Sequence, residues 1–371
     1  MNLIRVLIVE DSSLIRRKLT DVLTNQPELR IVAAVASGRL ALANLHDHAP
    51  DIVLVGISLP EKEGLKTLAS LRNASPTLPI IVFSRLVERG SQTTVDAMLL
   101  GATDYVTQPE SPTEFDRCVQ IELMSKIRSL AIPGQATTVR TMASAVVIHQ
   151  TTSSTIPAND RITMPVRTEA SPPAADIVAI ATSTGGPNAL ATLLSALPAS
   201  FRTPIVIVQH MPAGFTSTLA ESLRRQTGRS IQEANSIQPL NAGTVWLAPG
   251  GRHMIVGRDG LQMQVEPFDG PPENGCVPSA DVLFRSVAEQ FGSRSLTIIL
   301  TGMGCDGLAG SRSIRQSGGQ ILAQDEATSV AWGMPGQVAN AGLADDVLPL
   351  TDLPREIQLR TNHSRQNQQR Y

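Results

Sequence analysis

Short apolar runs alternate with segments of helical periodicity through the first 130 residues of the chain. The apolar runs that predict strands are LIRVLIV, RIVAAVAS, DIVLVG, PIIVFS and TDYVT. Each is followed by a segment with helical spacing, in order SSLIRRKLTDVL, RLALANLHD, LKTLASLRN, QTTVDAMLLG and PTEFDRCVQIELMSKIRSL. This alternation predicts a doubly wound parallel sheet with helices on both faces.

A second region with α/β patterning runs from Asp176 to about Leu353. Its predicted strands are DIVAIAT, TPIVIVQ, GTVWLA, HMIVG, LQMQV, LTIILT and GQILAQ. Asp259 and Gly260 form a hairpin signal between two of these strands. SADVLFRSVAEQF predicts a helix with Ser279 at its N-cap.

The segment between the two regions has no periodicity and is rich in Thr, Ser, Ala and Pro. Such a composition is typical of a linker, although ASAVVIHQ within it could form a short strand. We therefore expect an α/β protein of two doubly wound domains, one flavodoxin-like and one Rossmann-like. The predicted boundaries are 1–130 for the first domain, 131–175 for a flexible linker, 176–355 for the second domain and 356–371 for a polar tail.

Composition excludes several classes of partner. The 371 residues are 42% hydrophobic and 17% charged, with a formal net charge of −2. Without a basic excess, and with 3% aromatic residues, nucleic-acid binding is not expected. No apolar run approaches the ~20 residues of a membrane helix, and MNLIRVLIVEDSS reads as a strand rather than a signal peptide. Three widely spaced cysteines suit a reducing compartment, so we expect a cytoplasmic protein without membrane insertion.

Polar residues at the strand ends of the first region are expected to face one crevice. Glu10 and Asp11 end the first strand, Ser84 the fourth, and Gln108 the fifth. The stretches VLIVEDSS, PDIVLVGISLPEKEGL, PIIVFS and GATDYVTQP resemble the receiver domain of two-component response regulators. The resemblance implies an aspartate that accepts a phosphoryl group at the position of Gly56, and a lysine at the position of Gln108.

Both of these receiver residues are absent. Without a carboxylate at Gly56 no acyl phosphate can form there, and Ser58 would give a phosphoester of different chemistry. Glu10 and Asp11 would hold Mg²⁺ more weakly without a third hard oxygen ligand, and an ordinary solvated acidic pair is an equal alternative. For Ser84 a strand-end cap is the favoured interpretation. We therefore interpret residues 1–130 as a pseudo-receiver that needs no cofactor.

The second region carries chemistry at three strand ends. Ser183 lies between a buried strand and a helix, beside Gly185 and Gly186, where free amides and the helix dipole suit an oxyanion site. The alternative is a turn that binds phosphate or a nucleotide. His210 and Asp306 each follow a further apolar strand, although a structural histidine and a turn aspartate are the simpler interpretations of each alone. Together, the three residues place a hydroxyl, an imidazole and a carboxylate at strand ends on one edge of the sheet. This is the geometry that a Ser–His–Asp triad requires, whatever the order of the residues along the chain.

Six stretches of this region resemble the chemotaxis protein-glutamate methylesterase domain over nearly its whole length. They are ATSTGGPNAL, VQHMPAGFT, VWLAPGGRHM, DGPPENGCVPSADVLFRSVA, LTGMGCDGLAG and AQDEATSVAWGMPGQVA. The resemblance implies Ser183 as the nucleophile, His210 as the general base and acid, and Asp306 as the group that orients His210. Thr184 and the backbone amide of Met303 are the candidate oxyanion donors.

The implied reaction is hydrolysis of glutamate γ-methyl esters on the cytoplasmic helices of methyl-accepting chemoreceptors. Many members of the family also convert receptor glutamines to glutamate, and both reactions are acyl transfers through one acyl-serine. The receptors are the expected partners, with a chemotaxis-type histidine kinase or other pathway proteins beside them. His253 is a fallback base, Cys305 is expected to pack, and Cys276 has no assigned role.

Two roles for the pseudo-receiver follow from the resemblance. It could be a docking module that leaves the esterase accessible, or it could still cover the active site until a protein partner relieves it. A non-catalytic signalling adaptor and a DNA-binding regulator are the alternatives of another class. The intact triad argues against the first, and the lack of a basic patch argues against the second.

Overall fold

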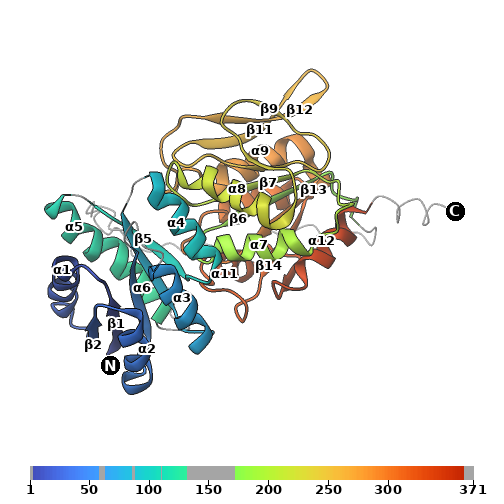
Figure 1. The fold of residues 1–371 in the computed structure, drawn as a ribbon. Helices are drawn as coiled ribbons and strands as arrows, with labels where there is room; N and C mark the ends of the chain where they lie inside the picture. Colours follow the sequence, from blue (N-terminus) through green and yellow to red (C-terminus); the bar gives the residue numbers. More distant parts are fainter. Residues whose placement is uncertain (1–2, 58–62, 86–87, 110, 132–171, 363–371) are drawn as a thin grey trace, which may run out of the picture.

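A computed structural model describes residues 3–57, 63–85, 88–109, 111–131 and 172–362. They form two α/β domains that lie side by side, blue to cyan and green to red in Figure 1. The possible strand ASAVVIHQ falls outside the described residues. None of the helices in the described ranges combines the length and hydropathy of a membrane span.

The first domain is built on a five-stranded parallel sheet of order β2-β1-β3-β4-β5, as in flavodoxin-like folds. Its strands are β1 (Ile4–Val9), β2 (Leu29–Val35), β3 (Ile52–Ile57), β4 (Ile80–Arg85) and β5 (Asp104–Gln108). Its helices are α1 (Ser13–Thr24), α2 (Gly38–His48), α3 (Glu63–Ala74), α4 (Glu88–Leu99), α5 (Pro112–Cys118) and α6 (Met124–Ala131). All five predicted strands and the helices between them are confirmed.

Helices cover both faces of this sheet because its strands are apolar on both sides. Residues of α1, α5 and α6 pack on one face, and residues of α2, α3 and α4 pack on the other. A π-helical turn, Val119–Leu123, joins α5 to α6, so the predicted single helix contains one wide turn. Such turns are frequent at functional sites, and this one carries residues that face the second domain.

The second domain has a seven-stranded parallel sheet of order β15-β14-β13-β6-β7-β10-β8. Its strands are β6 (Ile177–Thr182), β7 (Ile205–Gln209), β8 (Ile231–Glu233), β10 (Val245–Leu247), β13 (Ser295–Ile299), β14 (Gln320–Gln324) and β15 (Asp346–Leu348). Its helices are α7 (Gly186–Ala196), α8 (Phe215–Thr227), α9 (Ala280–Phe291), α10 (Leu308–Gln316), α11 (Met334–Asn340) and α12 (Leu353–Thr361), with a 3₁₀ turn at Gly292–Arg294. The order makes β13, β6 and β7 direct neighbours.

A small antiparallel sheet of order β11-β12-β9 lies beside the main one. It contains β9 (Gln238–Pro239), β11 (His253–Asp259) and β12 (Gln262–Phe268). The hairpin through Asp259 and Gly260 is confirmed, with Gly260 at φ +57°. The pattern did not reveal β8, β9 or β15, which span only two or three residues each.

The last described helix, α12, lies across the predicted boundary between the second domain and the tail. It continues to Thr361, and Ile357 is fully buried in the core. The ordered domain therefore extends beyond residue 355, because an apolar side chain after that point completes the packing against α7.

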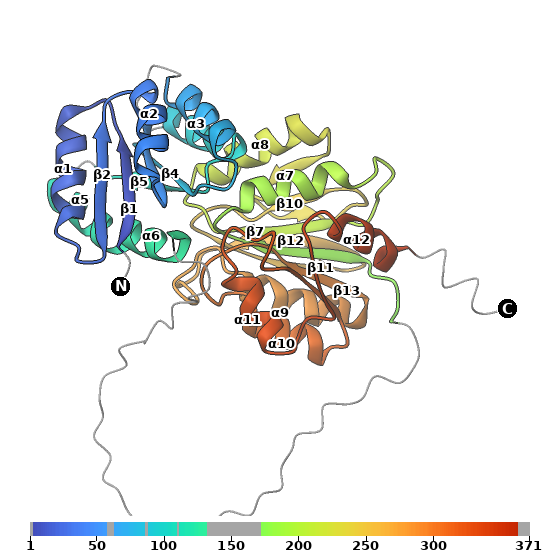
Figure 2. The ribbon, with the colours of Figure 1, turned by 90° about the horizontal axis from the view of Figure 1, so that it is seen from below.

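The two domains share an apolar contact. Helix α4 packs against α7 and α8, as Figures 1 and 2 show from two directions. The ring of Tyr105, at the end of the first sheet, stacks on Phe215 at the start of α8 with centroids 5.3 Å apart. Both rings are buried, and burial of a large apolar side chain stabilises a contact by about 1.5–3 kcal/mol.

Candidate active site

The three candidate catalytic residues lie at the carboxyl ends of three adjacent strands. Ser183 follows β6 directly, His210 follows β7 directly, and Asp306 lies in the loop between β13 and α10. From β6 the chain continues to β7 on one side of the sheet, and from β13 it continues to β14 on the other side. In open α/β sheets, such a reversal of strand order leaves a crevice at the carboxyl ends of the strands, where ligands bind. The predicted convergence of three strand ends is present.

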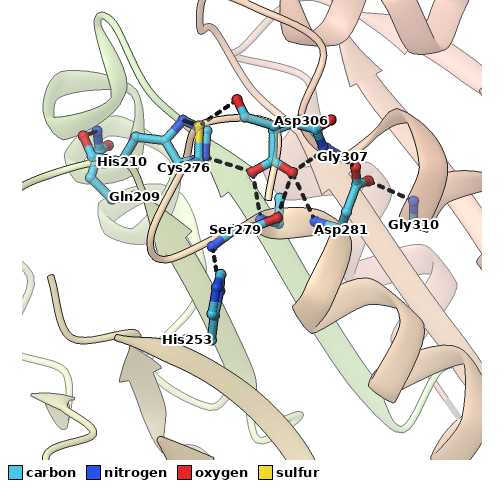
Figure 3. A network of polar contacts seen from close by, with 11 residues as sticks. Gln209, His210, His253, Cys276, Ser279, Asp281, Asp306, Gly307 and Gly310 are labelled. Atoms are coloured by element: carbon cyan, nitrogen blue, oxygen red, sulfur yellow. Dashed lines mark hydrogen bonds and ion pairs between the residues drawn. The ribbon is translucent and has the colours of Figure 1, made fainter. Parts of the chain in front are cut away.

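His210 and Asp306 are in direct contact. The Nε2 of His210 lies 2.8 Å from Oδ2 of Asp306, whose side chain is 2% exposed (Figure 3). A carboxylate accepts only, so Nε2 carries the hydrogen. In the neutral ring Nδ1 is therefore the nitrogen that can accept a proton.

The Asp306 carboxylate is fixed by the start of helix α9. Its Oδ2 accepts the backbone N–H of Ala280 at 2.6 Å, and its Oδ1 accepts the N–H of Asp281 at 3.1 Å. The hydroxyl of Ser279 donates to Oδ1 at 2.7 Å, and the N–H of Gly307 completes the set at 3.1 Å. Ser279 stands at the N-cap as predicted, but the carboxylate of Asp306 satisfies the helix amides in its place.

These contacts set the proton affinities of the pair. Burial raises the pKa of Asp306, but the His210 contact and the helix amides outweigh burial and lower it to about 2. Burial lowers the pKa of His210, but hydrogen bonds with Asp306 and Cys276 outweigh burial and raise it to about 9. Asp306 therefore stays ionised and strengthens His210 as a proton acceptor.

The backbone around Ser183 is held from several directions. Its N–H donates to Thr301 O at 3.1 Å, and its carbonyl accepts from the N–H of Gly186 at 2.8 Å and from Nε2 of Gln209 at 3.0 Å. Gln209 Nε2 also reaches the carbonyl of His210, so one buried side chain ties both catalytic turns together. The sequence reasoning missed Gln209, although its position directly before His210 was the available signal.

Ser183 and His210 line the same cavity. The cavity has a volume of about 370 Å³. In the part of the chain that the structure describes, no hydrogen bond joins Ser183 Oγ to His210. A Ser–His hydrogen bond that is absent without substrate can form when substrate binds, so its absence does not exclude the pair.

Both oxyanion candidates also line this cavity. Within the described ranges the backbone N–H of Met303 has no acceptor, so it is free to receive a developing oxyanion. The hydroxyl of Thr184 is engaged, since it donates to Oδ2 of Asp104 in the first domain at 2.5 Å.

The first domain forms the other wall of the cavity. It contributes Met98, Asp104, Tyr105, Ile121, Glu122, Ser125 and Lys126, opposite Ser183, Thr184, Pro187, Gln209, His210 and Met303. Lys126 donates to Oδ1 of Asp104 at 3.0 Å, and nearby carboxylates outweigh its burial and raise its pKa. The first domain therefore places the Lys126–Asp104 ion pair on the wall of the cavity that lies opposite the candidate catalytic residues.

His253 cannot act as the fallback base. Its Nδ1 accepts the N–H of Ser279 at 3.2 Å, and its Nε2 donates to Pro271 O at 3.0 Å, as Figure 3 shows in part. Both ring nitrogens are used and the residue is 2% exposed, so its role is structural.

Two cysteines differ from expectation. Cys305 is exposed, so the prediction that it packs is wrong. Cys276, which had no predicted role, lies beside His210, with Sγ 3.8 Å from His210 Nδ1. No sequence spacing signals this contact, because it depends on how the loop before α9 crosses the end of β7.

In the first domain only one member of the acidic pair is solvated, since Asp11 is exposed and Glu10 is buried. Glu10 is 4% exposed, and a Cβ on Gly56 would lie 1.9 Å from Glu10 Oε2. The Glu10 carboxyl therefore fills the space of the missing side chain. Burial and the hydrogen bond with Asp11 raise the pKa of Glu10 to about 7. Mg²⁺ takes carboxylate oxygens among its ligands, and the weak site expected at Glu10 and Asp11 stays a prediction. Ser84 is buried at the end of β4.

Comparisons with known proteins show which families the two domains match. Residues 178–357 match the family model described as CheB methylesterase, and residues 6–120 match the response regulator receiver domain model. The protein-glutamate methylesterase/protein-glutamine glutaminase of Trichodesmium erythraeum is 42% identical over 95% of this chain and 97% of its own length. That of Nocardioides sp. is 41% identical over 95% of this chain and 94% of its own length.

Among solved structures, the CheB methylesterase catalytic domain of Thermotoga maritima is 36% identical with a TM-score of 0.48. The match covers 49% of this chain and 97% of that one.

Proposed function

The chain belongs to the CheB methylesterase family, with a receiver domain ahead of the catalytic domain, and we propose that it acts as a serine hydrolase on chemoreceptors. Its substrates are glutamate γ-methyl esters, and glutamine side chains are a second substrate class. The observation that carries the proposal is the His210–Asp306 contact of 2.8 Å at the strand end next to Ser183.

The chemistry follows from the free nitrogen of His210. Nδ1 takes the Ser183 proton while Oγ attacks the ester carbonyl carbon, and the carbonyl electrons move to oxygen. The N–H of Met303 stabilises this oxyanion. His210 then protonates the departing methoxide, which leaves as methanol, and an acyl-serine remains.

Water completes the cycle by the same steps. His210 takes a proton from water, the hydroxide attacks the acyl carbon, and Ser183 leaves with the proton that His210 returns. The product is the glutamic acid side chain, which releases its proton to solvent and becomes the carboxylate. A glutamine side chain would follow the same path with ammonia as the leaving group.

The receiver acts as a cover that phosphorylation does not control. Gly56 offers no carboxylate to phosphorylate, and Gln108 supplies no cation. The wall of receiver residues across the cavity supports inhibition by the intact domain, in preference to a docking module that leaves the esterase open. A protein partner that binds the receiver would expose Ser183.

Methanol release from a methylated receptor fragment tests the activity. The full chain, a Ser183→Ala variant and a chain lacking residues 1–130 are compared. Release that depends on Ser183 and rises on deletion supports the proposal. Equal release with and without the serine would instead favour a non-catalytic adaptor.

A further inference from the structure

The base nitrogen of His210 has a thiol beside it. Cys276 lies between β12 and α9, half-buried, with its Sγ 3.8 Å from Nδ1 (Figure 3). Nε2 is held by Asp306, so Nδ1 and Sγ are the two groups left to bind a further atom. The proposed reaction uses Nδ1 but gives Cys276 no part.

Imidazole nitrogen and thiolate sulfur are preferred ligands of zinc. Bonds of about 2.0 Å to nitrogen and 2.3 Å to sulfur at a tetrahedral angle place the two ligand atoms about 3.5 Å apart. The observed 3.8 Å differs from that span by only a few tenths of an ångström. A cation could therefore join the two atoms with a small side-chain movement.

Asp306 supplies the outer partner that such a site requires. Histidines that bind metals commonly donate the other ring N–H to a carboxylate, which fixes the ring and raises its basicity. Here that carboxylate is already held by helix amides and by Ser279. The ligand atoms offered by His210, Cys276 and Asp306 lie within 4.8 Å of one another.

We propose that His210 and Cys276 form a binding site for a thiophilic divalent cation, Zn²⁺, which reversibly inhibits the enzyme by occupying the base nitrogen. Nδ1 donates its lone pair to the metal, and the Cys276 thiol binds as thiolate and releases its proton to solvent. Water and groups of the cavity fill the remaining positions. The inhibition rests on the proposed function, whereas the binding does not.

The test uses the full-length, metal-free chain with Zn²⁺ alone and with Co²⁺ as a spectroscopic substitute. We expect a thiolate-to-cobalt charge-transfer band and competition for Zn²⁺ with a chromophoric chelator. Cys276→Ser and Cys276→Ala remove the band and weaken zinc binding by at least about tenfold. Asp306→Asn weakens zinc binding by about 10–100-fold, as expected for an outer-shell carboxylate.

The other two cysteines are matched controls. Cys118→Ser and Cys305→Ser should leave the band and the zinc affinity unchanged. Wild-type affinity in both Cys276 variants, with folding verified by thermal unfolding, would overturn the site.

In the wild-type chain, Zn²⁺ should abolish methanol release and a chelator should restore it. Binding without inhibition overturns the inhibitory role. A chain with no esterase activity at all contradicts the proposed function, while the cobalt band still decides the metal site.

Discussion

Thr184, which follows Ser183, donates its hydroxyl hydrogen to Asp104 of the receiver domain at a distance of 2.5 Å. The contact is buried, and Lys126 holds the other oxygen of the same carboxylate. A carboxylate of the receiver domain thus binds the residue that follows Ser183. This hydrogen bond and the Tyr105–Phe215 stack join the two domains. Under the proposed function, they hold the receiver over the cavity.

Asp104→Asn is expected to raise methanol release from the intact chain. A hydrogen bond to a charged group contributes about 1.5–3 kcal/mol, so its loss shifts the equilibrium toward the uncovered state by about tenfold or more. Steady-state rates on a methylated receptor fragment provide the measurement. Asp21→Asn, on the exposed surface of α1, is the matched control and should leave the rate unchanged. A rate for Asp104→Asn equal to that of the control would contradict the cover.

The pH profile should report the raised pKa of His210. The ring must be neutral to take the serine proton, so kcat/KM should rise with pH and level off above the raised pKa of about 9. Asp306→Asn removes one of the two contacts that raise this pKa, the other being Cys276, so the apparent pKa falls, and kcat falls on the order of 10⁴-fold. Ser183→Ala at each pH gives the background. An apparent pKa unaffected by Asp306→Asn would count against the assigned pair.

Phosphodonors are expected to have no effect on the wild-type chain. Incubation with acetyl phosphate and Mg²⁺ should leave the methanol-release rate unchanged and produce no acyl phosphate, because Gly56 has no carboxylate. Measuring bound phosphate and rate together checks both points. Acceleration of the wild-type enzyme under these conditions would refute independence from phosphorylation.

The position that a Cβ of Gly56 would take leads to a separate prediction about stability. A Cβ at Gly56 must displace the Glu10 carboxyl, so Gly56→Ala should cost less in a Glu10→Ala background. The coupling in the free energy of unfolding is expected at about 0.5–3 kcal/mol, measured by a double-mutant cycle in urea. Additive effects of the two substitutions would show that the carboxyl does not fill this space.

Gly302 is expected to control the position of the nucleophile. A Cβ there would lie 2.9 Å from Ser183 Cβ and 2.5 Å from Met334 Sδ. Gly302→Ala should therefore lower kcat by about 10²-fold, the usual effect of a displacement near 1 Å. Gly257→Ala, which meets only the end of the Glu266 side chain in the β11–β12 hairpin, is the control. Equal kcat values for the two variants would contradict this role.

The strand ends were predictable because parallel strands leave a strong apolar signal. The runs that became β6, β7 and β13 place Ser183, His210 and Asp306 at one edge of a sheet, whatever the strand order beyond them. Strands of two or three residues, such as β9, lack enough positions to show alternation. Their pairing comes from tertiary contacts, which the local pattern does not contain.

Contacts between segments far apart in the chain could not be predicted from the sequence. Ser279 was correctly placed at a helix start, but nothing local indicates that Asp306 satisfies its helix amides. Likewise, neither Asp104 nor Thr184 carries a signal that they meet across a domain boundary. Cys276 had no role until the structure brought its loop against the end of β7.

The carboxylate that caps helix α9 serves folding as well as chemistry. A related protein without hydrolase activity would still need an acid at position 306 to accept the N–H groups at the start of α9. The presence of this acid is therefore weak evidence that a protein is an active enzyme. In the described residues, the Ser183 hydroxyl caps no helix. Loss of this serine would therefore be the clearer sign that a related protein keeps the fold without hydrolase activity.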